Sequence, residues 1–120
     1  MRIGYFADGP WDHKAFDRII SDNSIEIQFI TVRYDKRDTE LLRKAEEHQI
    51  AVEMNRNINS EEFISRMKYY QPDMFVSMSF NQIFKSEMIN LPQFKTINCH
   101  AGKLPFYRGR NILNWALIND

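Results

Sequence analysis

Short apolar runs and amphipathic stripes alternate along most of this chain. Between the runs, apolar residues recur three and four positions apart, which is the spacing of one face of a helix. Strands and helices that alternate at these lengths predict an α/β fold, with an open, mainly parallel twisted sheet and helices on both of its faces. The runs themselves are bounded by turn residues and predict buried strands at residues 2–7, 24–32, 50–54, 74–78 and 95–98.

Capping and helix-breaking residues indicate where the helices begin and end. Asp38 or Thr39 can cap the second helix. The clearest helical stripe follows Asn59, which we expect to cap its helix because Glu62 can reach back to it. Pro72 then ends the same helix, since a proline cannot continue it.

The final stretch predicts a further helix. Apolar residues over 112–118 fall at helical spacing, and no strand follows before the chain stops at Asp120. A helix that packs on a sheet normally leads into another strand. We therefore expect residues 1–120 to form one domain that is incomplete at its C-terminus.

Composition and charge argue against several classes of protein. Sixteen basic and sixteen acidic residues cancel, so no strong field favours nucleic acid or an anionic membrane as a partner. The lone Cys99 excludes an internal disulfide and a cysteine-rich zinc site, and we expect no metal. No apolar run approaches the roughly 20 residues that span a bilayer, and the N-terminus lacks the layout of a signal peptide. The sequence predicts a soluble, cytoplasmic protein.

The usual signatures of nucleotide-binding α/β folds are absent. A dinucleotide fingerprint needs three glycines at fixed spacing after the first strand, and Gly4 and Gly9 do not supply it. No Walker-type lysine–serine loop is present either. His13 and His48 lie among charged neighbours, and we expect both to be solvated surface residues.

An amide and an imidazole lie two residues apart at the end of the last predicted strand. Because side chains alternate along a strand, Asn98 and His100 are expected on one face and Cys99 on the other, in the core. Open α/β sheets bind ligands where their strands end. An amide can donate to a developing oxyanion, and a neutral imidazole can take a proton from an attacking amine. We interpret Asn98 and His100 as a catalytic pair.

A longer pattern surrounds this pair. The motif N-x-H begins at Asn98, and L-P-x-Y-R-G begins at Leu104. Together they resemble the signature of the formyltransferases that use 10-formyltetrahydrofolate, a family with a Rossmann-like N-terminal domain. Residues 76–84 and the Leu-Pro turn at 91–92 also look like the strand, folate loop and turn of that family.

Within the family, Gly102-Lys103 replaces the Ser-Leu of the enzymes that act on transfer RNA and on purine precursors. The segment 101–115 looks most like the enzymes that formylate an amino sugar carried on a nucleotide, such as the dTDP-4-amino-4,6-dideoxyhexose formyltransferases. Their products go to bacterial surface polysaccharide, including the O-antigen of lipopolysaccharide. The resemblance therefore implies a nucleotide-linked amino sugar as the small-molecule acceptor and 10-formyltetrahydrofolate as the donor.

The resemblance also implies a role for each matching residue. The sugar amine attacks the formyl carbon, Asn98 and His100 stabilise the oxyanion, and the proton passes from the amine to the leaving nitrogen. Arg108 is an even choice between contacting the substrate and tying its own loop to neighbouring carbonyls, and Phe80 between contacting the folate and packing in the core. The residues implied in the pterin pocket are Phe80, Asn81, Gln82, Ile83, Phe84 and Leu104. Those implied at the sugar and its phosphates are Lys103, Tyr107, Arg108 and Arg110.

One departure from the family is expected to matter. The catalytic set of the family has a third member, an aspartate in an Asp-x-Gly motif downstream of the last predicted helix, and Asp120 is not that residue. We expect the 120-residue form to be inactive or very weak, because such sets lose most of their activity when one member is missing. Two alternatives remain open. The chain is the N-terminal part of a methionyl-tRNA formyltransferase, or it is a non-catalytic folate-binding or oligomerisation module that forms a homodimer through an exposed sheet edge.

Overall fold

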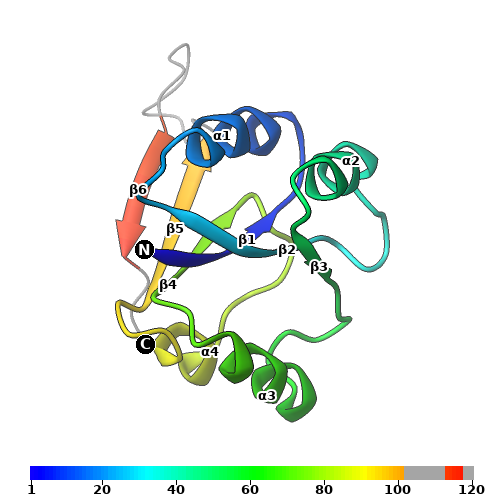
Figure 1. The fold of residues 1–120 in the computed structure, drawn as a ribbon. Coiled ribbons are helices and arrows are strands. Elements are labelled where there is room, and N and C mark those ends of the chain that lie inside the picture. Colours follow the sequence, from blue (N-terminus) through cyan, green and yellow to red (C-terminus); the bar gives the residue numbers. More distant parts are fainter. Residues whose placement is uncertain (102–112, 118–120) are drawn as a thin grey trace.

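The structure, a computed structural model, describes the backbone of residues 1–101 and 113–117 and the side chains of residues 1–99. Within this part of the chain, six strands form one sheet in the order β3-β2-β1-β4-β5-β6 (Figure 1). The strands are β1 (Arg2–Ala7), β2 (Glu26–Thr31), β3 (Ala51–Glu53), β4 (Met74–Met78), β5 (Thr96–Ala101) and β6 (Leu113–Leu117).

The first five strands run parallel, as the alternating pattern predicted. From β1 the chain moves outward through β2 to β3, and it then returns to β4 on the other side of β1. The connections after β1 and β4 therefore leave the sheet in opposite directions. In open α/β sheets, this change of direction opens a crevice at the carboxyl ends of the strands, where ligands bind.

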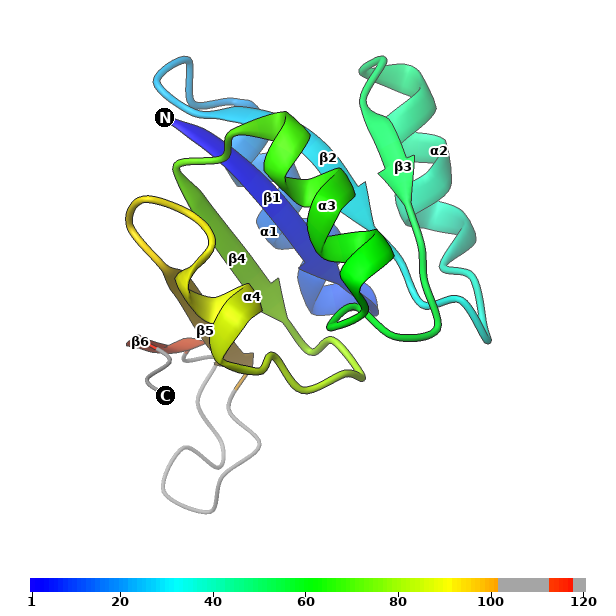
Figure 2. The same cartoon turned by 90° about the horizontal axis from the view of Figure 1, so that it is seen from below.

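Helices cover both faces of the sheet (Figure 2), which confirms the predicted layering. We name the two sides by their helices, the α1/α2 face and the α3/α4 face. The helices are α1 (Pro10–Ile20), α2 (Thr39–Glu47), α3 (Glu61–Tyr70) and the short α4 (Ser86–Asn90).

The cores under the two helix pairs differ in composition. The core of the α1/α2 face is mostly aliphatic, with residues such as Ile30 and Leu41, and it includes Cys99 from β5. The core of the α3/α4 face is rich in phenylalanine. Phe6 lies at its centre and makes edge-to-face contacts with five other rings, at centroid distances between 4.9 and 6.4 Å. Those rings belong to Phe29, Phe63, Phe75, Phe80 and Phe84.

A glycine in β1 makes room for one of these rings. A Cβ atom at Gly4 would lie 2.2 Å from the ring of Phe29, far inside van der Waals contact. The pairing of β1 with β2 also shifts register between Ile3 and Gly4. Gly4 therefore lets the aromatic core reach the sheet backbone, because any other side chain would displace the ring.

Two expectations about local structure were wrong. The cap of α3 is Ser60, whose hydroxyl accepts from the backbone N–H of Phe63, and not Asn59. Residues 113–117 form the strand β6, antiparallel to β5, where a helix over 112–118 was expected. The segment Leu-Asn-Trp-Ala-Leu carries apolar residues at every second position as well as at helical spacing, and the open edge of β5 offers the backbone partners that favour the strand.

None of the helices in the described part of the chain is long and apolar enough to cross a bilayer.

Candidate active site at the carboxyl edge of the sheet

Strand β5 carries the predicted catalytic positions. The hydroxyl of Thr96 donates to the carbonyl of Ile89 in α4, at 3.1 Å, so the even-numbered side of β5 faces the α3/α4 layer. Asn98 lies on that side, pairs in register with Ser77 of β4, and is half-buried. Cys99 points into the opposite core and is fully buried, as predicted. Burial raises the pKa of the Cys99 thiol to about 11, which keeps it protonated and inert at neutral pH.

The second member of the pair lies at the limit of what the structure describes. His100 is part of β5, two residues after Asn98, and its side chain is outside the described side chains. Its placement beside the amide of Asn98 therefore stays a prediction. The predicted pocket residue Leu104 and the predicted substrate residues Lys103, Tyr107, Arg108 and Arg110 also lie outside the described residues.

The loop after β4 lies on the same side of the sheet as Asn98. Its residues 79–85 begin at Ser79, which adopts a positive φ of 51° and turns the chain away from the strand. The rings of Phe80 and Phe84 pack into the aromatic core, at 5.7 and 4.9 Å from the ring of Phe6. By contrast, Asn81 is exposed and Ile83 is 83% exposed. The loop is thus anchored by its two aromatic rings and presents its middle to solvent.

Two amide side chains join this loop to the loop between β3 and α3. Gln82 accepts from the backbone N–H of Ile58 at 2.9 Å and donates to the carbonyl of Asn55 at 2.8 Å. Asn59 donates to the carbonyl of Ile83 and accepts from the backbone N–H of Lys85, both at 2.9 Å. We call these four hydrogen bonds the amide clasp. The sequence pointed to Asn59 only as a helix cap, since nothing local indicates a partner 24 residues away.

A second set of hydrogen bonds holds the loops after β1 and β2. Asp38 caps α2 by accepting from the backbone N–H of Leu41 at 3.1 Å, as expected for one of the two candidate caps. The same carboxylate accepts from the backbone N–H of Gly9 at 2.9 Å, at the start of α1. The Nε2 atom of His13 lies 2.7 and 2.8 Å from its two oxygens. We call this set the carboxylate clasp. His13 is therefore a partly buried hydrogen-bond partner of Asp38 and not the solvated surface residue that was expected.

Electrostatics in this region follow from the same contacts. Partial burial of Asp38 favours its neutral form, but the hydrogen bonds from Gly9, His13 and Leu41 outweigh burial and hold its pKa below the usual value. Burial raises the pKa of nearby Asp8, although Arg33 at 3.7 Å acts in the opposite direction. Among the described residues, no group of three or more histidine, cysteine or acidic side chains is arranged to hold a metal ion.

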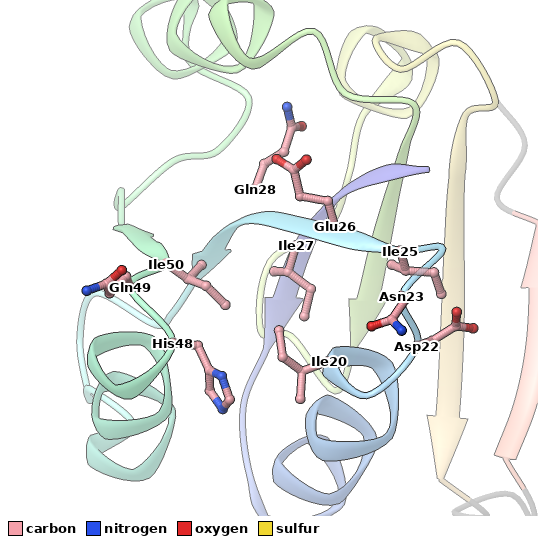
Figure 3. A pocket seen from close by; sticks show the side chains of 10 residues that line it. All are labelled: Ile20, Asp22, Asn23, Ile25, Glu26, Ile27, Gln28, His48, Gln49 and Ile50. Carbon is pink, nitrogen blue, oxygen red and sulfur yellow. The ribbon is translucent and has the colours of Figure 1, made fainter.

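The hollow drawn in Figure 3 lies at the other edge of the sheet. It has a volume of about 420 Å³ and is lined by residues where β2 begins and where α1 and α2 end, including Ile27 and His48 (Figure 3). Isoleucine side chains form much of its wall. It is separated from Asn98 by the length of the strands, so it is not part of the candidate site.

Comparison with known proteins places the chain among the formyltransferases. Residues 1–119 match the family described as formyl transferase. A methionyl-tRNA formyltransferase of Clostridium acetobutylicum is 36% identical over 99% of this chain, which covers 41% of that protein. A methionyl-tRNA formyltransferase of Clostridium novyi is 45% identical over 48% of the chain, which covers 19% of that protein. The chain thus spans less than half the length of these curated relatives.

A solved structure shows the same fold. The phosphoribosylglycinamide formyltransferase of Bacillus halodurans superposes with a TM-score of 0.67 at 18% identity, and the match covers 88% of this chain and 58% of that one. At this identity, the likeness concerns the fold alone.

Proposed function

The chain belongs to the formyl transferase family, and from this membership we propose that it forms the part of a formyltransferase that binds 10-formyltetrahydrofolate and supplies the catalytic amide and imidazole. The observation that carries the proposal is the shared position of Asn98 and the loop 79–85. Both lie on the α3/α4 side of the sheet, at its carboxyl edge, next to the change of direction between β1 and β4. An α/β sheet of this kind binds its ligands there.

In this proposal the loop 79–85 binds the donor, and strand β5 supplies the catalytic groups. The exposed middle of the loop, at Asn81 and Ile83, receives the pterin of the donor. The amide of Asn98 donates a hydrogen bond to the formyl oxygen as it gains negative charge during attack by the acceptor amine. His100 takes the proton of that amine and passes it toward the leaving nitrogen of the folate. The attacking amine therefore loses its positive charge, and the leaving nitrogen does not depart as an anion.

Two acceptors are consistent with this chemistry, and methionyl-tRNA is the first. The named relatives, one of which matches over 99% of the chain, are methionyl-tRNA formyltransferases, which favours this acceptor over the nucleotide-linked amino sugar expected from the sequence. A transfer-RNA partner also runs against the expectation, drawn from a net charge of zero, that no nucleic acid is bound. The amino sugar remains a second candidate because of the residue pattern over 101–115.

Donor binding is tested with 5-formyltetrahydrofolate, a stable analogue of the donor, by calorimetric titration of the chain. We expect saturable binding, and we expect Ile83→Asp to weaken it at least tenfold because an aspartate replaces an apolar contact with the pterin. Tyr69→Asp is the matched control, since Tyr69 is 93% exposed on α3 and away from the loop. No binding by the unaltered chain, or equal binding by both variants, would refute the proposed donor site.

The acceptor is tested by equilibrium binding of methionyl-tRNA and of a dTDP-linked amino sugar to the same chain. Binding of methionyl-tRNA alone supports the first candidate, and binding of the nucleotide sugar alone supports the second. Turnover is a separate measurement. If the chain alone formylated either acceptor at the rate of a full-length relative, the expectation that it needs a downstream aspartate would be wrong.

A further inference from the structure

The middle of the loop 79–85 needs contacts from outside the loop to hold it in one conformation. Its two ends are anchored through Phe80 and Phe84, but Asn81 and Ile83 lie between these anchors and face solvent. A solvent-exposed loop of this length would sample many conformations. The apparent affinity for a ligand that needs only one of them is the intrinsic affinity multiplied by the fraction of time that this conformation is populated. The amide clasp supplies the missing constraint.

The amide clasp forms hydrogen bonds with some polar groups of the loop and not with others. Asn59 occupies the carbonyl of Ile83 and the backbone N–H of Lys85, each at 2.9 Å. Both the oxygen and the nitrogen of the Gln82 side chain bond backbone groups of the other loop, at Ile58 and Asn55. Within the described part of the chain, no hydrogen bond takes up the backbone N–H groups of residues 81–83. Figure 2 shows the β3–α3 and β4–α4 connections close together at the carboxyl edge.

We propose that Asn59 is a positioning residue for the formyl donor, holding residues 81–83 so that their backbone N–H groups face the bound pterin. This inference rests on the proposed function, and it deepens it by adding a residue that lies outside the folate loop. Asn59 does not touch the donor. It acts by joining the carbonyl of Ile83 and the N–H of Lys85, a task that requires one donor and one acceptor on the same short side chain.

Gln82 has the same role from within the loop 79–85, because its side chain bonds the backbone of the other loop. Because both ends of its amide bond the 55–58 backbone, it contributes to the donor site through its own backbone and not through its side chain. Two side chains, one from each loop, thus hold the loop 79–85. This arrangement is what a site needs when binding depends on backbone groups held in one conformation.

The test compares two neighbouring variants of similar cost in stability. Asn59→Ala removes both loop contacts, whereas Ser60→Ala removes the cap of α3 and leaves the clasp intact. We expect both to lower the melting temperature by a few degrees. Only Asn59→Ala should raise the dissociation constant for 5-formyltetrahydrofolate, by about tenfold, while Ser60→Ala should change it less than twofold. Asn59→Asp keeps the bond to Lys85 but cannot donate to Ile83, and should fall between Asn59→Ala and the unaltered chain.

The outcomes separate this inference from the proposed function. If the unaltered chain binds the folate and Asn59→Ala binds it as tightly as Ser60→Ala does, the positioning role is overturned and the donor site stands. If the unaltered chain does not bind the folate, both are overturned. A selective loss in Asn59→Ala, together with faster amide hydrogen exchange at Lys85, would establish the role.

Discussion

The two faces of the sheet differ in the residues that form their cores and in the side chains that hold their loops together. On the α1/α2 face, an aliphatic core lies under loops held by a carboxylate, through the contacts of Asp38 with Gly9, His13 and Leu41. On the α3/α4 face, an aromatic core lies under loops held by neutral amides, through Asn59 and Gln82. The face that carries the candidate site is the one without charge in its clasp.

The difference follows from what each clasp must hold. The carboxylate clasp joins the starts of two helices, where backbone N–H groups and the helix dipole favour an anion. The amide clasp joins loops that present both N–H and C=O groups, and an amide side chain can satisfy one of each. A neutral clasp also adds no net charge beside a site where charge develops during the proposed reaction, which leaves that charge to Asn98 and His100.

The aromatic core should be the more sensitive of the two. Phe6→Ala removes the ring that contacts five others, and we expect it to lower the free energy of unfolding by about 3–5 kcal/mol. Leu41→Ala, fully buried on the other face, is the matched change and should cost about 2–4 kcal/mol. Urea unfolding followed by circular dichroism measures both. A larger loss for Leu41→Ala would remove the proposed contrast between the cores.

The carboxylate clasp comes next in expected effect. Asp38→Ala removes a helix cap and leaves the backbone N–H of Gly9 and the ring of His13 without their acceptor, so we expect a loss of about 2–3 kcal/mol. Asp38→Asn keeps an oxygen acceptor but loses the negative charge, and should cost less. If the two variants were equally destabilised, the charge and not the cap would account for the effect.

Acid should break the hydrogen bonds of the carboxylate clasp and leave those of the amide clasp intact. The pKa of Asp38 in the folded chain lies below its ordinary value of 3.8. Its contribution to stability is therefore complete above that value and is lost as the pH falls through the lower folded pKa. Amide hydrogen exchange between pH 5 and pH 2, corrected for intrinsic rates, should show falling protection at Gly9 and steady protection at Lys85 and Ile58 until global unfolding. Parallel loss at all three amides would contradict the contrast.

The smallest effect is expected at alkaline pH, where the α3/α4 face has its own charged contact. Glu53 at the end of β3 is buried, forms an ion pair with Arg66 at 2.9 Å and accepts from the hydroxyl of Tyr70. Burial, together with the hydrogen bond to Glu53, raises the pKa of Tyr70 from 10.0 to about 12. Its contribution to stability is complete below pH 10 and is lost as the pH rises toward 12.

Tyr70→Phe isolates this contribution, because it removes the titrating hydroxyl and keeps the ring that packs 4.4 Å from Phe29. The difference in unfolding free energy between the unaltered chain and this variant should shrink between pH 10 and pH 12. A difference that stays constant over this range would mean that Tyr70 does not titrate with folding.

Several parts of the fold could be read from local patterns. The apolar runs predicted the first five strands, and Pro72 correctly marked the end of α3, which stops at Tyr70. The alternation along β5 correctly placed Cys99 in the core and Asn98 on the other side. The roles of Asn98, His100 and the loop residues stay predictions, because their chemistry depends on partners that the fold alone does not supply.

The sequence by itself determined the first five strands, the helices between them and which side of each faces a core, because the repeat of apolar positions is a property of neighbouring residues. The tertiary structure decided what depends on pairing. It made residues 113–117 a strand along the edge of β5, gave Asn59 partners 24 and 26 residues away, and joined Asp38 to His13 across 25 residues. A hydrogen bond between distant loops forms only once strand order and register bring the loops together, and no local pattern encodes that distance.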